Sequence, residues 1–179
     1  MIYEHGDHYE ITTNISVLKE LSQQYTTCPI TTFLDHGLNY PVCVAWGCAN
    51  NVIDAHRNAQ RAMKEAMLCK ESAAFIVLGN NVIIGPLSTA RRITYTDKPG
   101  RQLEQLGGQL SISPSYFSKI ASILSQKGED TITAKELAFY LDITPRSASR
   151  IFGQAGAWGA GYSAKIPPAE HTGTPHKGL

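Results

Sequence analysis

The chain has 179 residues, of which 42% are hydrophobic and 17% are charged, a composition typical of a folded globular protein. It has no apolar run long enough to span a membrane, and its first ten residues lack the basic start and apolar stretch of a secretory signal, so we expect a cytoplasmic protein. The net charge of +1 conceals an asymmetry: residues 1–90 carry five Lys or Arg against eight Asp or Glu, whereas residues 91–179 carry eleven against seven. The second half is therefore where a polyanion would bind.

The cysteines indicate a reducing compartment. They form no Cys-x-x-Cys pair, and two of them flank an apolar strand-like run, where small buried thiols are common. We therefore predict free structural cysteines, and neither a metal site nor a cofactor. The four are Cys28, Cys43, Cys48 and Cys69.

The first half alternates between strand-like and helix-like patterns, which favours helices packed on a sheet. The clearest helix covers residues 51–69, where apolar residues recur every three or four positions. Apolar runs at 73–78 and 82–85 flank Gly79-Asn80-Asn81, a sequence typical of a hairpin turn. The other predicted elements are a strand at 9–13 after the turn-like His5-Gly6-Asp7, a helix at 15–25 capped by Asn14, and a strand at 42–46 between Pro41 and Gly47.

The pattern changes near the middle of the chain. Residues 88–100 lose periodicity and end in Pro-Gly, so we predict a linker over 91–100. From residue 101 the pattern is helical, and after residue 155 it becomes rich in Gly, Pro and His. The prediction is an α+β protein with an α/β domain at 1–90 and a mostly α domain at 101–179.

Residues 134–152 carry the most specific signal, two short helices separated by a sharp bend. Thr133 can cap the first helix, and Thr144 can cap the second, which has Pro145 at its first position, where the missing N–H costs nothing. Asp142 stands at the bend, where glycine is usual, and Asp adopts the left-handed conformation more easily than most residues. The segment therefore predicts a helix-turn-helix.

The second helix of such a motif lies in the major groove of DNA, with its first turns at the base edges. We therefore predict that helix 145–154 reads double-stranded DNA. Arginine pairs with guanine in a bidentate manner, and serine reaches bases or phosphates. The alternative is an ordinary helical hairpin with solvated arginines. The predicted DNA-binding residues of this segment are Thr144, Arg146, Ser147, Ser149 and Arg150.

The surrounding sequence favours a winged helix-turn-helix domain. Residues 113–128 predict a helix that ends at a glycine, and residues 131–133 predict a short strand. The Gly- and Pro-rich residues 156–179 would form the wing, with Lys165 and Lys177 at DNA phosphates. A frayed tail is the alternative for the last part of this segment.

A second segment, residues 103–120, fits the helix-turn-helix template as well. Either segment could be the reader on pattern alone. We favour residues 134–152, because they carry two arginines and the predicted wing follows them.

The chain resembles bacterial, mostly Firmicute-type, transcriptional regulators that join a degenerate nucleotide-cyclase-like (GGDEF-like) domain to a C-terminal winged helix. The resemblance is carried by ELAFYLDITPRSASRIF at 136–152, by DAHRNAQRAMKEA at 54–66, by FIVLGNNVIIGPL at 75–87 and by the first hairpin. It implies a truncated ferredoxin-like α/β sandwich in the first half. The first strand and helices of that fold are missing, so we expect either a piece of a longer protein or a homodimer that covers the exposed sheet face.

The resemblance aligns His5-Gly6-Asp7-His8-Tyr9 with the GGDEF signature of diguanylate cyclases. The family's chemistry needs an acid in the third place to hold a metal, and Asp7 supplies one, but His8 replaces the fourth acid. The other metal-binding aspartate would lie on an earlier strand. Because half of a metal clamp does not catalyse phosphoryl transfer, we interpret Asp7 as a turn residue and a ligand remnant.

The resemblance is weakest at the C-terminal end. A basic G-R-P-R-type segment is usual there, and the corresponding residues 173–177 read Gly-Thr-Pro-His-Lys. Gly153 and Gly156 stand where good helix formers are expected. These departures predict fewer tail contacts to DNA and either an early end of the recognition helix or a remodelled wing.

The leading hypothesis is a DNA-binding transcriptional regulator, not an enzyme, whose first domain senses a ligand or dimerises. The alternative is a nucleotide-binding or nucleotide-cyclase-like enzyme that uses the HGDHY hairpin and loses turnover with Asp7→Ala. A third hypothesis places a small effector such as a nucleotide on the first domain, with an anion at the N-terminus of helix 51–69. A plainly capped helix is the simpler interpretation there.

Overall fold

The computed structural model describes residues 2–6, 8–97, 112–154 and 163–165. Within these ranges the protein is mixed α+β, as predicted. Its elements, in chain order, are β1 (Ile2–His5), β2 (His8–Ile11), α1 (Ile15–Leu21), α2 (Pro29–Gly37), β3 (Cys43–Gly47), α3 (Val52–Ala66), β4 (Ala73–Val77), β5 (Val82–Gly85), β6 (Ile93–Thr96), α5 (Pro114–Lys127), β7 (Thr131–Thr133), α6 (Ala134–Leu141), α7 (Pro145–Gln154) and β8 (Ser163–Lys165).

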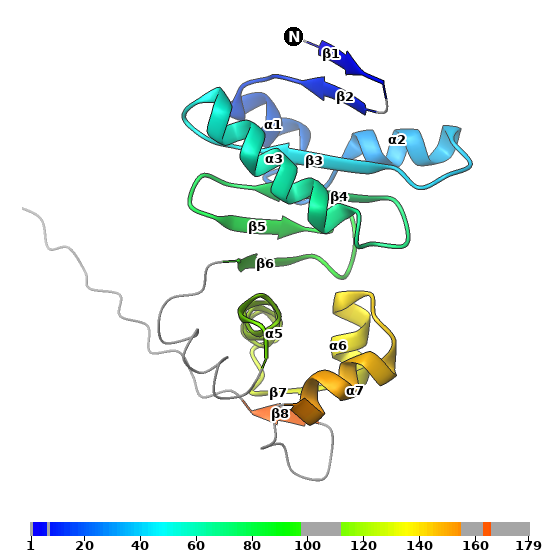
Figure 1. Ribbon diagram of the computed structural model, residues 1–179, viewed down its shortest axis with the longest axis vertical. Coiled ribbons are helices and arrows are strands. Elements are labelled where there is room, and N and C mark those ends of the chain that lie inside the picture. The colour runs from blue at the N-terminus through cyan, green and yellow to red at the C-terminus, as the bar shows by residue number, and fades with distance from the viewer. Residues whose placement is uncertain (1, 7, 98–111, 155–162, 166–179) are drawn as a thin grey trace, which may run out of the picture.

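A four-stranded mixed sheet in the order β3-β4-β5-β6 forms the centre of the molecule (Figure 1). Strand β3 runs parallel to β4, so the chain between them must cross over, and α3 makes this crossing. The remaining pairs are antiparallel, and β4 and β5 form the predicted hairpin around residues 79–81. The α1–α3 half of the fold and the helical α5–α7 half lie at opposite sides of β6 (Figure 1).

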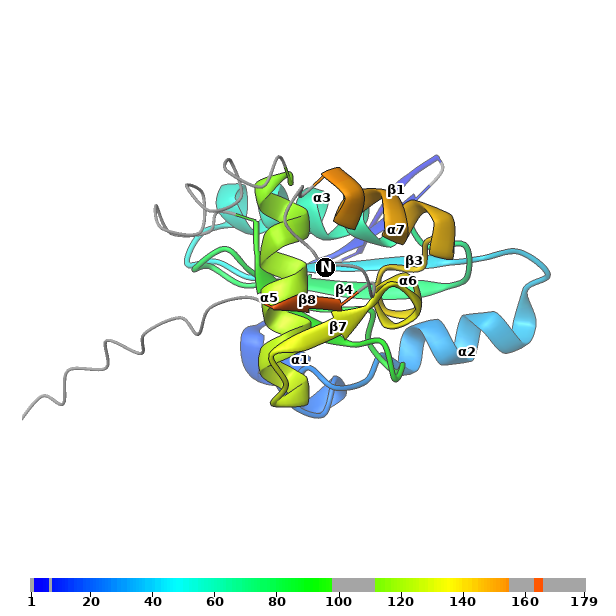
Figure 2. The same ribbon diagram turned by 90° about the horizontal axis from the view of Figure 1, so that it is seen from below.

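Both faces of the sheet are covered. Strand β4 is buried at every position, which explains its uninterrupted apolar sequence, AAFIV. Phe75 and Val77 pack in the cluster that contains Ala62 of α3, whereas Ile76 packs in a second cluster with Leu18 of α1. In Figure 2, α3 lies on one side of the sheet, and α1 and α2 lie on the other.

Helix α3 approaches β3 closely because small residues line the contact. A Cβ atom added at Gly47 would lie 1.9 Å from the carbonyl oxygen of Ala55 and 2.2 Å from the backbone nitrogen of Ala59. The helix begins at Asn51, whose side chain accepts the backbone N–H of Asp54 at 2.9 Å. This cap therefore occupies a backbone N–H group at the N-terminus of α3, the place where the third hypothesis puts an anion.

The main apolar core runs through both halves of the molecule. One cluster of buried residues joins the sheet to α3, α5, α6 and α7. Polar contacts accompany it: the Lys119 ammonium of α5 lies 2.8 Å from the Glu65 carboxylate of α3 and 4.9 Å from the ring centre of Tyr95. The two halves are therefore packed against one another rather than held apart.

The predicted linker over 91–100 is wrong for residues 93–96, which form β6. This strand pairs with β5, and Thr96 donates its backbone N–H to the Ser118 hydroxyl of α5. The strand was missed because only Ile93 and Tyr95 are buried, and their alternation is too short to distinguish from a loop.

The first hairpin is formed by β1 and β2 as a separate two-stranded sheet. A ferredoxin-like sandwich would have placed these strands in the main sheet, so that expectation is not met in the described residues. Helix α1 ends at Leu21, earlier than predicted, because Gln23, Gln24 and Tyr25 adopt positive φ. Helix α2 was not predicted.

The cysteines are free, as predicted, and Cys28 and Cys48 are buried. Burial raises the pKa of the Cys48 and Cys69 thiols and so disfavours their reactive thiolate forms. In the described part of the chain, no helix combines the length and apolar character needed to cross a bilayer.

Candidate nucleic-acid interface

Helix α6 begins with a capping box. The Thr133 hydroxyl accepts the Glu136 backbone N–H at 3.2 Å, and the Glu136 carboxylate accepts the Thr133 backbone N–H at 2.8 Å. The Lys127 ammonium at the end of α5 also binds this carboxylate. These hydrogen bonds lower the pKa of Glu136 to about 2, and the hydrogen bond from Lys127 has the largest effect.

This cap predicts a pH dependence of folding. The pKa of Glu136 is about 2 in the folded chain against an ordinary 4.5, so its contribution to stability is complete above pH 4.5 and is lost as pH falls toward 2. We expect Glu136→Gln to be roughly 1 kcal/mol less stable at neutral pH, and to lose less stability than the native chain between pH 4.5 and 2. Urea unfolding at several pH values measures the free energy of unfolding of both proteins. If this free energy fell equally in the native chain and in Glu136→Gln between pH 4.5 and 2, the lowered pKa would not belong to Glu136.

The bend between α6 and α7 has the predicted geometry. Asp142 ends α6 in the left-handed conformation, with φ 53° and ψ 38°. Ile143 then donates its backbone N–H to the carbonyl of Ala138 at 3.1 Å. Helix α7 begins directly afterwards, where the Thr144 hydroxyl accepts the backbone N–H of Ser147 at 3.2 Å. Residues 134–154 are therefore two helices across a sharp turn.

One face of α7 is anchored in the main core. Ala148 is fully buried and Phe152 is 5% exposed, in the same cluster as Leu137 of α6. The helix continues through Gly153 to Gln154, so Gly153 does not end it early. The core contact therefore fixes which side of α7 points outward.

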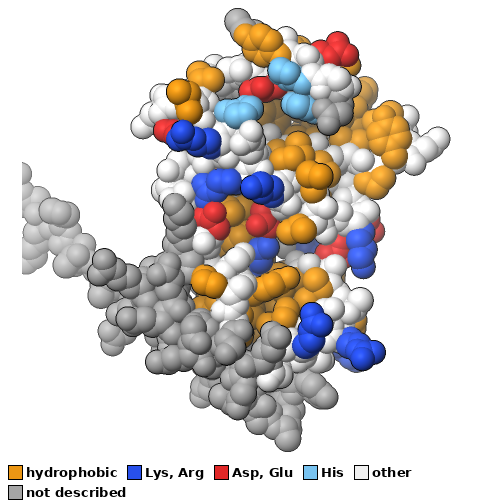
Figure 3. Space-filling view, viewed as in Figure 1, with side chains coloured by type: hydrophobic (Ala, Val, Ile, Leu, Met, Phe, Trp, Pro, Cys, Tyr) orange, Lys and Arg blue, Asp and Glu red, His pale blue; other side chains and the backbone are white. Residues whose placement is uncertain are grey.

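The outward face carries the predicted cations. Arg146 and Arg150 are both exposed, and a spacing of four places them on one side of the helix. Basic side chains project from this part of the surface in Figure 3. Among the residues with assigned positions, neither arginine forms an ion pair with a carboxylate. Both are available to bind an anion.

The predicted polar residues have less uniform positions. Ser147 and Ser149 are half-buried, and the Thr144 hydroxyl is committed to the cap and lies 3.0 Å from the Ser147 hydroxyl. Thr144 therefore organises the start of α7. Lys165 belongs to β8, which pairs antiparallel with β7, but its side chain lies outside the described residues. Lys177, Asp7 and residues 103–111 of the segment 103–120 also lie outside them.

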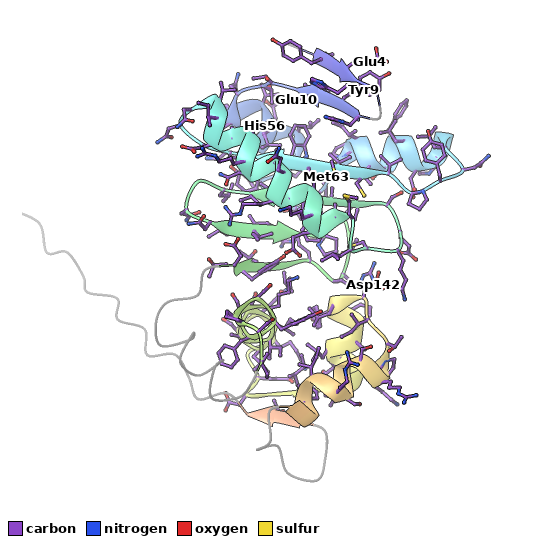
Figure 4. All side chains as sticks on the ribbon, in the orientation of Figure 1. Glu4, Tyr9, Glu10, His56, Met63 and Asp142 are labelled. Atoms are coloured by element: carbon purple, nitrogen blue, oxygen red, sulfur yellow. The ribbon has the colours of Figure 1, made fainter. Side chains whose placement is uncertain are left out.

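The N-terminal hairpin is tied to α3 by a carboxylate. Glu10 contacts the His56 ring at 3.1 Å and the His5 ring at 3.7 Å, and its position next to His56 is visible in Figure 4. The rings of His5 and His8 stack with centres 5.0 Å apart. No group of three or more metal-ligating side chains is found among the described residues.

Sequence reasoning missed two features of this region. Lys135 is exposed on the first turn of α6, the helix that crosses the DNA backbone in a helix-turn-helix. Asp142 does more than form the turn, because its carboxylate binds the guanidinium of Arg91 at 2.8 Å. The role of Lys135 could have been predicted from its position in the helix-turn-helix motif. The contact between Asp142 and Arg91 could not, because the two residues lie far apart in the sequence.

Comparisons with family models, with curated proteins and with solved structures find no match for the chain. The geometry described above is therefore the basis for any functional assignment.

Proposed function

We propose that the protein is a bacterial transcription regulator that binds double-stranded DNA through α7. The observation that carries this proposal is the pair of exposed arginines, Arg146 and Arg150, one turn apart on a helix whose opposite face is buried. Arginines in this arrangement suit bidentate contacts to guanine and to phosphates. The sharp bend before α7 supports docking of this helix in the major groove.

The elements around the bend support a winged helix. Their order is α5, β7, α6, α7 and β8, with β7 and β8 paired in a small antiparallel sheet. In this proposal the β7–β8 pair forms the base of the wing, and Lys165 contacts a phosphate. Lys135 at the start of α6 would contact the backbone beside the groove.

We propose a sensing or dimerising role for the first half, with no catalytic function, in a cytoplasmic protein. Its N-terminal hairpin and α1 expose several large apolar side chains, which favours a homodimer. Such a dimer would present two copies of α7 to two half-sites in DNA. A nucleotide is the effector class that the GGDEF-like resemblance suggests. The exposed apolar residues are Ile2, Tyr3, Tyr9, Ile11, Ile15 and Val17.

Selection from a random library of DNA duplexes tests this proposal with the full chain. We expect enrichment of a short motif, repeated if the protein binds as a dimer, and an affinity that falls steeply with salt. The salt slope reports the number of phosphates that the protein neutralises. Recovery of the unselected library at every salt concentration would contradict sequence-specific binding.

A further inference from the structure

One side chain at the bend of the helix-turn-helix, that of Asp142, makes polar contacts with two loops beside the sheet. The two carboxylate oxygens of Asp142 have different partners: Oδ1 lies 2.8 Å from the Arg91 guanidinium, and Oδ2 accepts the backbone N–H of Lys70 at 3.3 Å. Figure 4 shows Asp142 at the end of α6 that faces the sheet. The ion pair is largely shielded, with 17% of the Arg91 side chain and 24% of the Asp142 side chain exposed.

Turn geometry alone does not explain an aspartate at this position. The residue has φ 53°, a conformation that glycine adopts without the steric cost of a Cβ atom. Asparagine also tolerates it. A carboxylate adds the ability to accept an ion pair and a backbone N–H together, and both contacts are present here.

The ion pair lies at the protein surface. An open surface pocket of about 420 Å³ is lined by Arg91 and Asp142 themselves together with Thr89, Ala138 and Phe139. Phe139 is 52% exposed. By contrast, α5 is held against β6 and α3 by buried residues and by the Lys119–Glu65 pair. At the bend, Leu141 and Ile143 pack against the main core on either side of Asp142, and the polar contacts of Asp142 add a directional restraint to this packing.

We propose that Asp142 is a positioning residue that, together with the core packing of α7, sets the angle at which α7 presents Arg146 and Arg150. Its carboxylate ties the bend to Arg91 and to the Lys70 backbone, on two loops that flank the central sheet. A change in either loop would then alter the angle of α7. The effect on DNA binding rests on the proposed function, whereas the attachment itself does not.

The orientation of α7 can be measured without DNA. Spin labels introduced as unnatural amino acids at Lys64 on α3 and Gly153 on α7, both exposed, report the distance between the halves. We expect a narrow distance distribution in the otherwise native chain and a broader one in Asp142→Gly, Asp142→Asn and Arg91→Met. Combining Arg91→Met with Asp142→Asn should broaden it no further than either change alone, since both remove the same contact.

Glu71→Gln is the matched control. Glu71 also pairs with Arg91, at 3.5 Å, but its side chain is 83% exposed, so the distance distribution should stay narrow in this variant. If Asp142 served only as a turn residue, Asp142→Gly would keep the native distribution, because glycine fits the left-handed conformation better. That result would overturn the proposal. Circular dichroism identifies any variant that fails to fold, and Asp142→Asn, which suits the turn, then decides the question.

DNA binding gives the second measurement. We expect Asp142→Asn to weaken binding to the selected duplex about fivefold, with the salt slope unchanged, because the arginines remain present but less well oriented. Broadening of the distance distribution in a chain that selects no DNA would support the attachment and refute the proposed function. Unchanged affinity together with an unchanged distribution would refute the attachment alone.

Discussion

Replacing Gly47 by alanine is expected to destabilise the fold by about 3 kcal/mol or more, the largest effect on stability that we predict. The new methyl group would overlap the backbone of α3 at both Ala55 and Ala59, with the nearest atom 1.9 Å away. Backbone atoms cannot rotate aside as a flexible side chain can. Helix α3 must therefore move away from β3, which would disturb the core on that face of the sheet.

Gly37→Ala is the matched control for this change. Gly37 ends α2, and a Cβ atom there would meet no heavy atom within 4 Å. We expect its free energy of unfolding to stay within about 0.5 kcal/mol of the native value. Urea unfolding followed by circular dichroism compares the two variants, and equal stabilities would show that the close approach of α3 to β3 is relaxed in solution.

The largest functional effect is expected from the arginines of α7. Arg146→Ala and Arg150→Ala should each cost roughly 1–3 kcal/mol of specific binding, about a 5- to 150-fold loss of affinity for the selected duplex. The pair of changes should reduce specific binding by roughly 100-fold or more, because both side chains act on one short stretch of groove. A guanidinium that contacts a base should also relax the preference at that base.

Arg57→Ala removes the same charge from α3. Its side chain is 69% exposed and pairs with Asp54 within the same helix, far from α7 in the sequence. The affinity for the selected duplex should change little in this variant. Fluorescence anisotropy at fixed salt measures the affinities of the native chain, the two single α7 variants, the double variant and Arg57→Ala. If the two α7 variants bind the duplex as tightly as the Arg57 variant, α7 is not the reading helix, and the segment 103–120 becomes the candidate.

Helix ends in this protein could be predicted from local chemistry. Asn14, Ser113 and Thr133 each accept a backbone N–H at the start of the expected helix, and Gly128 ends α5 in the left-handed conformation. These signals act over three or four residues, so the sequence alone contains them.

Elements that depend on distant partners could not be predicted in this way. Helix α2 begins at Pro29, after an N-cap residue, Cys28, that makes no side-chain cap, and its β-branched Ile30, Thr31 and Thr32 favour strand. Strand β6 forms because it pairs with β5 and is hydrogen-bonded to α5. Hydrophobic pattern does not report such pairings when the strand is short.

The candidate site shows the same division. The exposure of Arg146 and Arg150 followed from the helical period and from the apolar residues opposite them, and the cap at Thr144 followed from its position before Pro145. The contact between Asp142 and Arg91 joins the end of α6 to the loop between β5 and β6, which lie far apart in the sequence, so no local pattern contains it.

The shared core has a consequence for how the protein unfolds. Because one buried cluster includes residues from the sheet, from α3 and from α5 to α7, neither half can lose its structure without exposing apolar surface of the other. Heat or denaturant should therefore melt the whole chain in a single cooperative transition, observed alike by far-ultraviolet dichroism and by tryptophan fluorescence, to which Trp46 in β3 contributes. A DNA ligand bound at α7 would then protect the distant sheet from hydrogen exchange to the same extent as its own helix.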